Sequence, residues 1–381
     1  MSSPVIVVAP DKFKGSLTAP EAAAAVERGL RRLWPAADIR ACPMADGGDG
    51  TLDAILSRGG EQGERAVSGA GDAKVGAAYG IVSAPEGRTA VIEIARIVGL
   101  VDPLATATTV ERRSTRGVGE LIRALLDDGV GRFLIGLGGS STNDGGAGML
   151  AALGLRFLDA SGRDIAPTPE GLAALARVDA TGLMPALAQA HITIMSDVDN
   201  PLCGAQGATA VFGPQKGVAA GALAGLDATL LRYATVVERA LGREAATKPG
   251  AGAAGGLGFA LQLLGGAPRS GAEVIADVVG LDLALAGADW AITGEGRTDA
   301  QTLLRKAPFV VAERARRAAV PVTLLSGAID DTALGTLGSH FAGCFALTAG
   351  PATLEDAMKH AAGLLADRAE AIARVWQAAA G

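Results

Sequence analysis

Residues 5–18 read VIVVAPDKFKGSLT, and this stretch decides the fold. Its apolar, β-branched run ends at Pro10 and predicts a strand that is buried in a parallel sheet. A polar loop follows, and Thr18 with Glu21 then forms a capping box, which predicts a helix running to about Trp34. The stretch is therefore one strand, loop and helix unit of the kind that builds doubly wound parallel sheets.

The same order recurs elsewhere in the chain. A second strand at residues 39–43 leads into a polar, glycine-rich loop and a helix through about Arg58. After about residue 288 the alternation of strands and helices returns, with strands expected at residues 290–293, 321–325 and 341–347. These five strands predict a flavodoxin-like α/β fold with a doubly wound parallel sheet that is interrupted after its second strand.

The interruption predicts a second α/β domain. We expect residues 1–60 and 287–381 to form a discontinuous flavodoxin-like domain and residues 61–286 to form the inserted one. Ligands of such sheets bind beyond the carboxyl ends of the strands, so the active site is expected in the cleft between the two domains. Strands are expected in the inserted part at residues 74–83, 88–95, 133–137 and 191–195, and helices after residue 117 and at residues 223–241.

Composition excludes several classes of protein. The 381 residues are 49% hydrophobic, which indicates a globular protein, and a net charge of −6 argues against a nucleic-acid partner. Aromatic residues make up only 3%, too few for the platforms on which nucleic-acid bases stack. No basic leader precedes the first apolar run, and no stretch has the ~18 apolar residues of a membrane span without dense glycine. We therefore expect a cytoplasmic protein without a membrane partner.

A glycine-rich loop at residues 138–146 is the main candidate for a phosphate site. It reads GGSSTNDGG and lies between an expected strand and an expected helix. Glycines let backbone N–H groups approach a ligand, and a helix N-terminus favours anions. A tight turn capped by Asn or Asp is the alternative. The candidate ligand-binding residues of this loop are Gly138, Gly139, Ser140, Ser141, Thr142, Asn143 and Asp144.

Basic and hydroxyl side chains in other loops are candidates for binding anions. Lys14 and Ser16 lie near the start of the first helix and could contact a phosphate or a carboxylate. Arg297 suits bidentate contact with the same groups, unless it pairs with a neighbouring carboxylate. Gln215, Lys216 and Lys306 complete this set.

Carboxylates that follow expected strands are candidates for a metal ion or a general base. Asp46 and Asp49 stand among glycines after the second strand, and Asp197, Asp199 and Asn200 follow the strand at residues 191–195. Mg²⁺ takes one or two carboxylates together with phosphates and water, and a carboxylate beside a substrate hydroxyl can accept its proton. Asx turns are the alternative at both places.

Several familiar motifs are missing from the sequence. There is no Gly-Lys dipeptide, hence no Walker A loop, and no His-Arg-Asp loop of protein kinases. The loop at residues 138–146 fails the nucleophile elbow at Thr142 and the dinucleotide fingerprint at Ser141. The three cysteines and three histidines are scattered, which argues against a disulfide framework and a histidine-based zinc site.

Seven stretches together resemble the glycerate kinase type 1 family. They read APDKFKGSL at residues 9–17, ADGGDGT at 45–51, GGSSTNDGGAG at 138–148, DVDNPL at 197–202, FGPQKG at 212–217, GAGAAGGLG at 250–258 and TGEGRTD at 293–299. They span the chain in the order of the family. The chain departs from the family at Arg305, because the family usually has Gly before the residue that corresponds to Lys306.

The resemblance implies a kinase that uses ATP and Mg²⁺ to phosphorylate D-glycerate, typically to 2-phosphoglycerate. It also implies a flavodoxin-like domain that carries an inserted second α/β domain. With it, the loop at residues 138–146 is expected to bind ATP together with Gln215 and Lys216. The expected catalytic residues are Asp46, Asp197, Lys14 and Arg297, and the expected Mg²⁺ ligands are Asp46, Asp197 and Glu295. The expected substrate-binding residues are Asp11, Lys14, Ser16, Asp49, Asn200, Arg297 and Lys306.

Other functions stay open at this point. The chain could phosphorylate another small hydroxy acid or sugar acid, or give 3-phosphoglycerate as its product. It could also bind ATP or a metabolite as a sensing module without turnover, and a dehydrogenase is a weaker third class. We expect a monomer or a homodimer.

Overall fold

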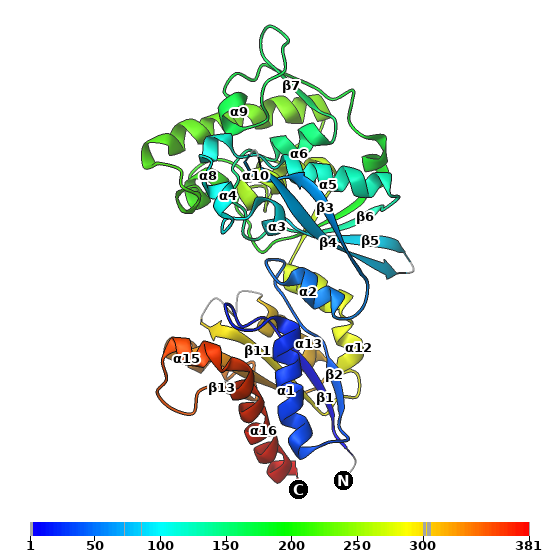
Figure 1. Cartoon of the computed structure of the whole chain (residues 1–381), viewed down its shortest axis with the longest axis vertical. Helices are drawn as coiled ribbons and strands as arrows, with labels where there is room; N and C mark the ends of the chain where they lie inside the picture. Colours follow the sequence, from blue (N-terminus) through cyan, green and yellow to red (C-terminus); the bar gives the residue numbers. More distant parts are fainter. Residues whose placement is uncertain (1–2, 72, 85, 300–301, 303–305, 381) are drawn as a thin grey trace. The chain divides into compact units, whose positions relative to one another are not determined.

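The computed structural model describes residues 3–71, 73–84, 86–299, 302 and 306–380, which form two compact units (Figure 1). Unit 1 comprises Met1–Asp46, Asp53–Gly59 and Ser270–Gly381, and unit 2 comprises Gly47–Leu52 and Gly60–Arg269. A second α/β unit is thus inserted after the second strand of the first, as the sequence predicts. The expected boundary after residue 286 differs from the observed one, because the helices that follow Ser270 pack on unit 1.

Unit 1 is built around a five-stranded sheet in the order β13-β12-β11-β1-β2, and all of its pairs are parallel. In chain order this is 2-1-3-4-5, the flavodoxin-like arrangement, so the predicted fold class is confirmed. The strands are β1 Val5–Pro10, β2 Asp38–Ala41, β11 Trp290–Thr298, β12 Val322–Ile329 and β13 Gly343–Ala346.

Helices cover both faces of this sheet. α1 packs against α16 and β1, whereas α13 contacts β11 and β12 and also packs on α11 and α12 (Figure 1). The predicted capping box at Thr18 and Glu21 is present at the start of α1. The helices are α1 Ala19–Leu33, α2 Thr51–Leu56, α11 Gly271–Val278, α12 Leu281–Leu285, α13 Ala307–Arg317, α14 Leu334–Leu337, α15 Leu354–Lys359 and α16 Ala361–Ala380.

Unit 2 contains a six-stranded sheet in the order β10-β9-β6-β5-β4-β3 and a two-stranded sheet of β7 and β8. The pairs β3–β4 and β4–β5 are antiparallel, and the pairs from β5 to β10 are parallel. The strands are β3 Glu61–Ser68, β4 Lys74–Ala84, β5 Gly87–Glu93, β6 Arg132–Gly136, β7 Arg156–Leu158, β8 Arg177–Asp179, β9 His191–Met195 and β10 Ala267–Arg269.

The helices of unit 2 enclose a large apolar core that includes Phe133, Tyr233 and Phe259. They are α3 Ala95–Val98, α4 Pro103–Thr106, α5 Arg116–Asp127, α6 Ala147–Ala152, α7 Pro169–Leu172, α8 Ala208–Phe212, α9 Leu223–Leu241 and α10 Ala253–Leu263. α10 contains three residues with non-helical backbone, at positions 254–256, where its chain passes close to the loop at residues 142–145. In the described ranges of the chain, no helix is long and apolar enough to cross a membrane.

Five strands differ from the sequence-based expectation: β3, β7, β8 and β10 were not predicted, and β11 is longer than expected. β3 was not predicted, because an edge strand that pairs on one side only can keep polar side chains such as those of Glu61 and Arg65 in solvent. β11 continues through Thr298, although its last five residues are glycine, charged or polar and were expected to form a loop. They stay in the strand because Glu295 and Arg297 keep their register with Ser326 and Ala328 of β12.

Candidate active site

The glycine-rich loop at residues 138–146 joins β6 to α6 in unit 2, and most of it is buried. Ser141, Thr142, Asn143 and Asp144 have no exposed surface, and Ser140 is 7% exposed. Three of its glycines have positive φ, among them Gly146 at 75°, where a Cβ atom would lie 2.3 Å from the Cβ of Ala260. The loop can therefore take this compact path only with glycine at such positions.

Lys216 places a positive charge beneath this loop. The residue is 4% exposed and closes the short 3₁₀ helix Pro214–Lys216, which follows α8. Its Nζ donates hydrogen bonds to Ser140 Oγ at 2.9 Å and to the Thr142 carbonyl at 2.7 Å. Within the described residues, no carboxylate lies within ion-pair distance of this ammonium group. Burial lowers the pKa of Lys216 to about 7, although the charge of Asp144 opposes the shift.

Arg113 is a second buried cation at the same loop, and the sequence did not reveal it. Its Nη1 donates to the Ser141 carbonyl at 3.0 Å and to the Lys216 carbonyl at 2.9 Å, and its Nε donates to the Thr108 carbonyl at 2.8 Å. The side chain is 4% exposed, and all these acceptors are neutral. Arg113 follows another arginine in the sequence, and no pattern there shows which of the two is buried.

Two hydrogen-bonding groups of the loop are left without a partner in the described structure. They are Thr142 Oγ1 and Asn143 Oδ1, both fully buried, while Asn143 Nδ2 donates to Thr209 Oγ1 at 2.9 Å. Buried polar atoms are nearly always hydrogen-bonded, so such exceptions need an explanation. The Lys216 ammonium group, the Thr142 hydroxyl group and the second N–H of Asn143 Nδ2 can donate to an anionic ligand, whereas Asn143 Oδ1 needs a donor.

Asp144 and Ser141 have structural contacts in the same loop. The Asp144 carboxylate accepts hydrogen bonds from the Thr115 N–H at 2.7 Å, Thr115 Oγ1 at 2.8 Å and the Gly146 and Gly148 N–H groups at 3.1 Å. Ser141 Oγ donates to the Val98 carbonyl at 2.9 Å. These two side chains therefore fix the shape of the loop through the chain around it.

The loop after β9 reaches the same edge of the six-stranded sheet. β6 and β9 are parallel neighbours, and the Leu137 N–H donates to the Met195 carbonyl at 3.2 Å. Asp197 is exposed in this loop, and Asn200 Nδ2 donates to the Gln206 carbonyl at 2.7 Å. Gln215, beside Lys216, is exposed. The structure therefore brings Asp197 to the sheet edge that carries the glycine-rich loop.

Unit 1 carries carboxylates at the carboxyl ends of its central strands. Asp11 follows β1 and is 8% exposed, and its pKa is raised to about 8 by burial and by the nearby charges of Asp46 and Glu295. Glu295 lies in β11, where its Oε1 accepts hydrogen bonds from Thr298 Oγ1 at 2.9 Å and Thr302 Oγ1 at 2.6 Å. Burial raises the pKa of Glu295 as well. Like charges thus gather at one end of this sheet.

The donor set of unit 1 fits a hard cation such as Mg²⁺. In the described part of the chain, no group of three or more His, Cys, Asp or Glu side chains is arranged to hold a metal ion. Mg²⁺ does not require such a group, because it usually keeps water and binds one or two carboxylates with substrate phosphates. Asp11 is buried near the negative charges of Asp46 and Glu295, and this clustering of carboxylates favours a cation here.

The predicted basic residues of unit 1 are more exposed. Lys14 is exposed, next to Gly15 with φ of 80°, and Ser16 Oγ donates to the Phe13 carbonyl at 3.0 Å. The Arg297 side chain is 70% exposed, and its Nη2 lies 3.8 Å from Asp330 Oδ2, so its ion-pair partner differs from those considered in the sequence. Lys306 precedes α13, and its positive charge partly opposes the rise in the pKa of Glu295. Arg305 lies outside the described residues.

Glu93 is a further buried acid that the sequence did not reveal. It ends β5 with 1% exposure, accepts a hydrogen bond from the Leu52 N–H at 2.7 Å and pairs with Arg96. Asp49, which is predicted to bind the substrate, is exposed in the loop before α2, and this loop passes close to Gly138. Glu93 therefore fastens the segment Gly47–Leu52 to unit 2. The apolar run before Glu93 signals a strand but not the partner of its last residue.

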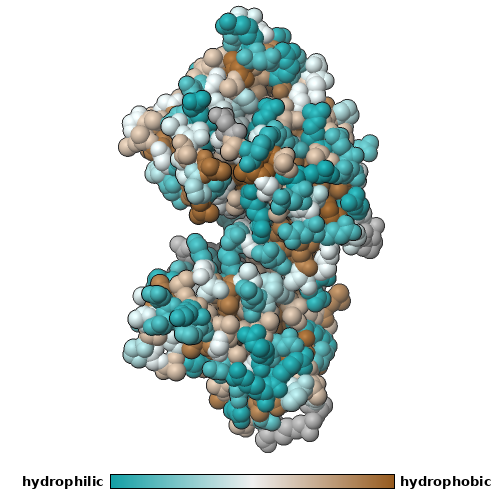
Figure 2. All heavy atoms as spheres, in the orientation of Figure 1, coloured by the Kyte–Doolittle hydropathy of each residue, from teal (hydrophilic) through white to brown (hydrophobic). Residues whose placement is uncertain are grey.

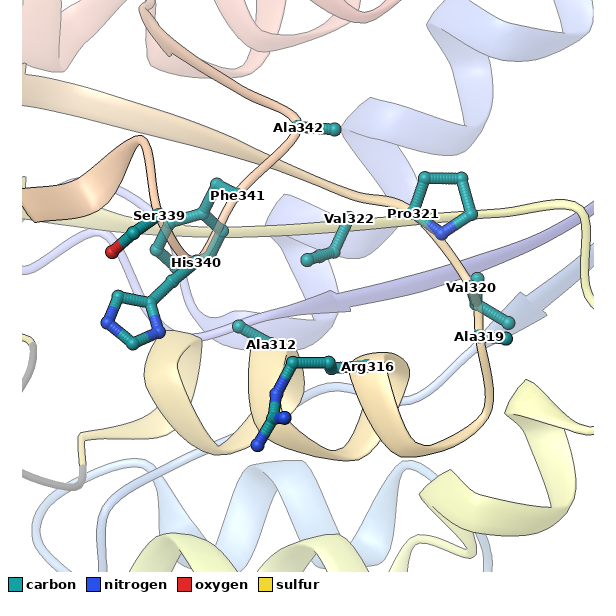
Figure 3. Close-up of a pocket in the computed structure, with 10 residues that line it drawn as sticks. All are labelled: Ala312, Arg316, Ala319, Val320, Pro321, Val322, Ser339, His340, Phe341 and Ala342. Carbon is teal, nitrogen blue, oxygen red and sulfur yellow. The ribbon is translucent and has the colours of Figure 1, made fainter.

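A cavity of about 460 Å³ in unit 1 lies apart from these residues (Figure 3). It is lined by α13 and by the chain just before β12 and β13, with Val322 and Phe341 on its apolar side and Arg316 and His340 at its polar side. Strands β12 and β13 begin here, whereas Asp11 and Glu295 lie toward the other ends of the parallel strands. None of the predicted site residues lines this cavity.

Comparisons with known proteins agree on one family. The model of the glycerate kinase family matches residues 6–377. A glycerate kinase of Bacillus subtilis is 44% identical over 94% of each chain, and a glycerate 2-kinase of Escherichia coli is 40% identical over 93% of each. The crystal structure of a putative glycerate kinase 2 from Salmonella typhimurium is 42% identical and superposes with a TM-score of 0.88 over 99% of both chains.

Proposed function

The chain belongs to the glycerate kinase family, and we propose that it transfers the γ-phosphoryl group of ATP to the 2-hydroxyl of D-glycerate. The products are ADP and 2-phosphoglycerate. One observation carries the phosphate part of this proposal. Lys216 and Arg113 are buried at the glycine-rich loop with only neutral oxygens as hydrogen-bond acceptors, beside the buried Thr142 hydroxyl group, which has no partner in the described structure. Phosphate oxygens supply the charge and the acceptors that such a site needs.

Residues 138–146 hold the phosphates of ATP in this proposal. Lys216 Nζ has three protons and uses two of them on Ser140 and Thr142, so one is left for a phosphate oxygen. Thr142 Oγ1 and the second N–H of Asn143 Nδ2 can donate hydrogen bonds from the loop. Arg113 holds the carbonyls of Ser141 and Lys216 and so fixes the distance between the loop and the lysine. Gln215 and the backbone of Gly138 and Gly139 complete the predicted set.

Two aspartates are candidates for the general base. Asp46 in unit 1 and Asp197 in unit 2 each follow a parallel strand, and either could accept the proton of the glycerate hydroxyl. Asp46, Asp197 and Glu295 are also the candidates for holding Mg²⁺, which would neutralise charge on the transferring phosphoryl group. Glu295 suits the second role better, because its two threonine donors stabilise and orient its carboxylate.

Residues of unit 1 are proposed to position glycerate. Lys14 and Arg297 are exposed cations that can bind its carboxylate or the transferring phosphoryl group. The other proposed contacts are Asp11, Ser16 and Lys306 of unit 1 and Asp49 and Asn200 of unit 2. Positioning and charge neutralisation supply most of the catalysis in phosphoryl transfer, so the proposal needs no covalent intermediate.

The test is an ADP-release assay with ATP, D-glycerate and Mg²⁺, together with ³¹P NMR of the product. Release of ADP that depends on D-glycerate, with phosphorus attached at C2, supports the proposal. Phosphorus at C3 changes the assigned hydroxyl, and a faster reaction with another hydroxy acid or sugar acid changes the substrate. Absence of ADP with every acceptor rejects the function. Omitting Mg²⁺ tests the metal, and the rate should then fall to the background of the assay.

A further inference from the structure

The segment at residues 99–108 joins the glycine-rich loop at both of its ends. At the first end, Gly99 forms a β-bridge with Ser140, and the Leu100 N–H donates to the Gly139 carbonyl at 2.8 Å. At the other end, the Thr108 carbonyl accepts a hydrogen bond from Arg113, which also holds Ser141. We call residues 99–108 the apolar strap. Its position relative to the loop is fixed by these bonds.

The strap exposes two large apolar side chains beside the proposed phosphate site. Val101 is 93% exposed and Leu104 is 57% exposed. Between them Asp102 caps α4 by accepting a hydrogen bond from the Leu104 N–H at 2.9 Å, and Ala105, at 1% exposure, anchors the helix in the core. The two side chains are thus exposed on a structured segment, where solvent contact costs free energy that a bound apolar surface would recover.

A second segment next to the loop also exposes an apolar side chain. Val211 of α8 is 42% exposed, and α8 is tied to the loop because Asn143 donates to its Thr209. On the face drawn in Figure 2, hydrophobic side chains gather over the part of unit 2 that carries the α4 and α8 labels in Figure 1. Exposed apolar side chains are therefore found on two segments that are hydrogen-bonded to the glycine-rich loop.

We propose that the apolar strap, through Val101 and Leu104, binds the face of the purine ring of the nucleotide. The inference rests on the proposed function, because it takes residues 138–143 and Lys216 as the phosphate site. If the phosphates of a nucleotide bind there, its nucleoside must lie against a segment next to that site. The strap is such a segment, because it is hydrogen-bonded to residues 139 and 140 of the loop. Aliphatic side chains pack against the flat face of a base and read none of its edge groups. A guanine nucleotide should therefore bind about as well as ATP.

The test compares ATP with inorganic tripolyphosphate, which has the phosphates without the base. The double variant Val101→Thr/Leu104→Gln keeps size and charge while it removes apolar surface. Titration calorimetry should show the Kd for ATP raised about fivefold, by the apolar area lost, and the Kd for tripolyphosphate changed by less than about twofold. Leu283→Gln is the matched control, since Leu283 is 83% exposed on a short helix of unit 1, and it should change neither constant.

Three other outcomes overturn the proposal, and a fourth rejects only the proposed function. An unchanged Kd for ATP shows that the strap does not bind the purine ring. If the double variant also changes the oligomeric state in solution, Val101 and Leu104 instead form a contact between copies of the chain. Equal weakening of ATP and tripolyphosphate shows that the strap acts on the loop and not on the base. Wild-type protein that binds tripolyphosphate as tightly as ATP has no base site at all. Tight ATP binding without phosphorylation of glycerate rejects only the proposed function.

Discussion

The buried candidate ligand-binding residues of the two units are of opposite charge type, acidic in unit 1 and basic in unit 2. In unit 1 the acids Asp11 and Glu295 lie at the carboxyl ends of central strands and Asp46 follows the edge strand β2; burial and the charges of Asp46 and Glu295 raise the pKa of Asp11 to about 8. In unit 2 the cations Lys216 and Arg113 lie beneath the glycine-rich loop, and burial lowers the pKa of Lys216 to about 7. Buried charge of one sign is costly in a folded chain. Each unit is therefore suited to a ligand of the other sign, a cation in unit 1 and an anion in unit 2.

The two units also differ in how far their candidate groups are fixed. Lys216 and the side chains of residues 140–144 are buried, and all of them except that of Thr142 are held by side-chain hydrogen bonds, so the candidate anion site is built without a ligand. Lys14 and Arg297 in unit 1 are exposed side chains with freedom to move. The contrast teaches that the candidate anion-binding groups of unit 2 are rigid, whereas the candidate basic side chains of unit 1 can adapt.

The largest expected effect comes from the two candidate bases, one in each unit. Asp46→Asn and Asp197→Asn should each lower kcat by at least about 100-fold, because a positioned base contributes that much to proton transfer. Steady-state kinetics with both substrates saturating measures the change. Asp199→Asn, two residues from Asp197 and equally exposed, is the control and should keep near-full activity. A variant with near-wild-type kcat excludes that aspartate as the base.

Removal of the buried ammonium should have the next largest effect. Lys216→Met should raise the Kd for ATP about 30-fold, since it takes a charged donor away from the phosphates and leaves Ser140 and Thr142 without their partner. Calorimetry measures the change, and Lys248→Met, at an exposed lysine of unit 2, is the control. If ATP binds the Lys216 variant as well as the wild type, the anion site of unit 2 is not the nucleotide site.

The Thr142 hydroxyl group should have a smaller effect. Thr142→Val keeps the shape of the side chain and removes an Oγ1 atom that has no partner in the described protein. The Kd for ATP should rise about fivefold by loss of one hydrogen bond, while the free energy of unfolding without ligand stays the same or increases slightly. Urea unfolding separates the two quantities. A loss of more than about 1 kcal/mol in stability would mean that the hydroxyl is bonded inside the folded protein.

The smallest expected effect is a pH dependence of stability that comes from Lys216. Its folded pKa of about 7 lies below the ordinary value of 10.5, so between these pH values the unfolded chain binds more protons than the folded one. Its contribution to the free energy of unfolding therefore rises with pH, by about 1 kcal/mol from pH 7 to 8. Urea unfolding of wild type and Lys216→Met at both pH values isolates this change. Equal differences between the two proteins at both pH values would contradict the pKa of about 7.

Much of the fold could be predicted because local patterns agree with the final structure. Short apolar stretches followed by loops and helices predicted the strands of unit 1 in their correct order, and Thr18 with Glu21 placed the start of α1. β3 and the end of β11 could not be predicted, because polar residues and glycines there stay extended through pairing with distant strands. The boundary near Ser270 depends on the packing of α11 and α12 against α13, which is not a local property.

The candidate site was predictable only in part for the same reason. Glycine-rich loops after strands are visible in the sequence, and residues 138–146 with Lys216 do lie together in the structure. Arg113 and Glu93 were missed, because burial of a charged residue is decided by partners far away in the chain. Which aspartate is the base, and whether both units serve one site, stay predictions.

The short segment Gly47–Leu52 limits how this protein can be rebuilt by genetic engineering. It belongs to unit 2 through the hydrogen bond of Leu52 to Glu93, yet the chain on each side of it belongs to unit 1. If residues 60–269 alone were replaced by those of a relative, the segment Gly47–Leu52 would have to pack against a unit 2 of different sequence. A chimera therefore needs residues 47–52 and residues 60–269 from the same relative. Libraries that recombine at residue 60 alone should yield many misfolded products.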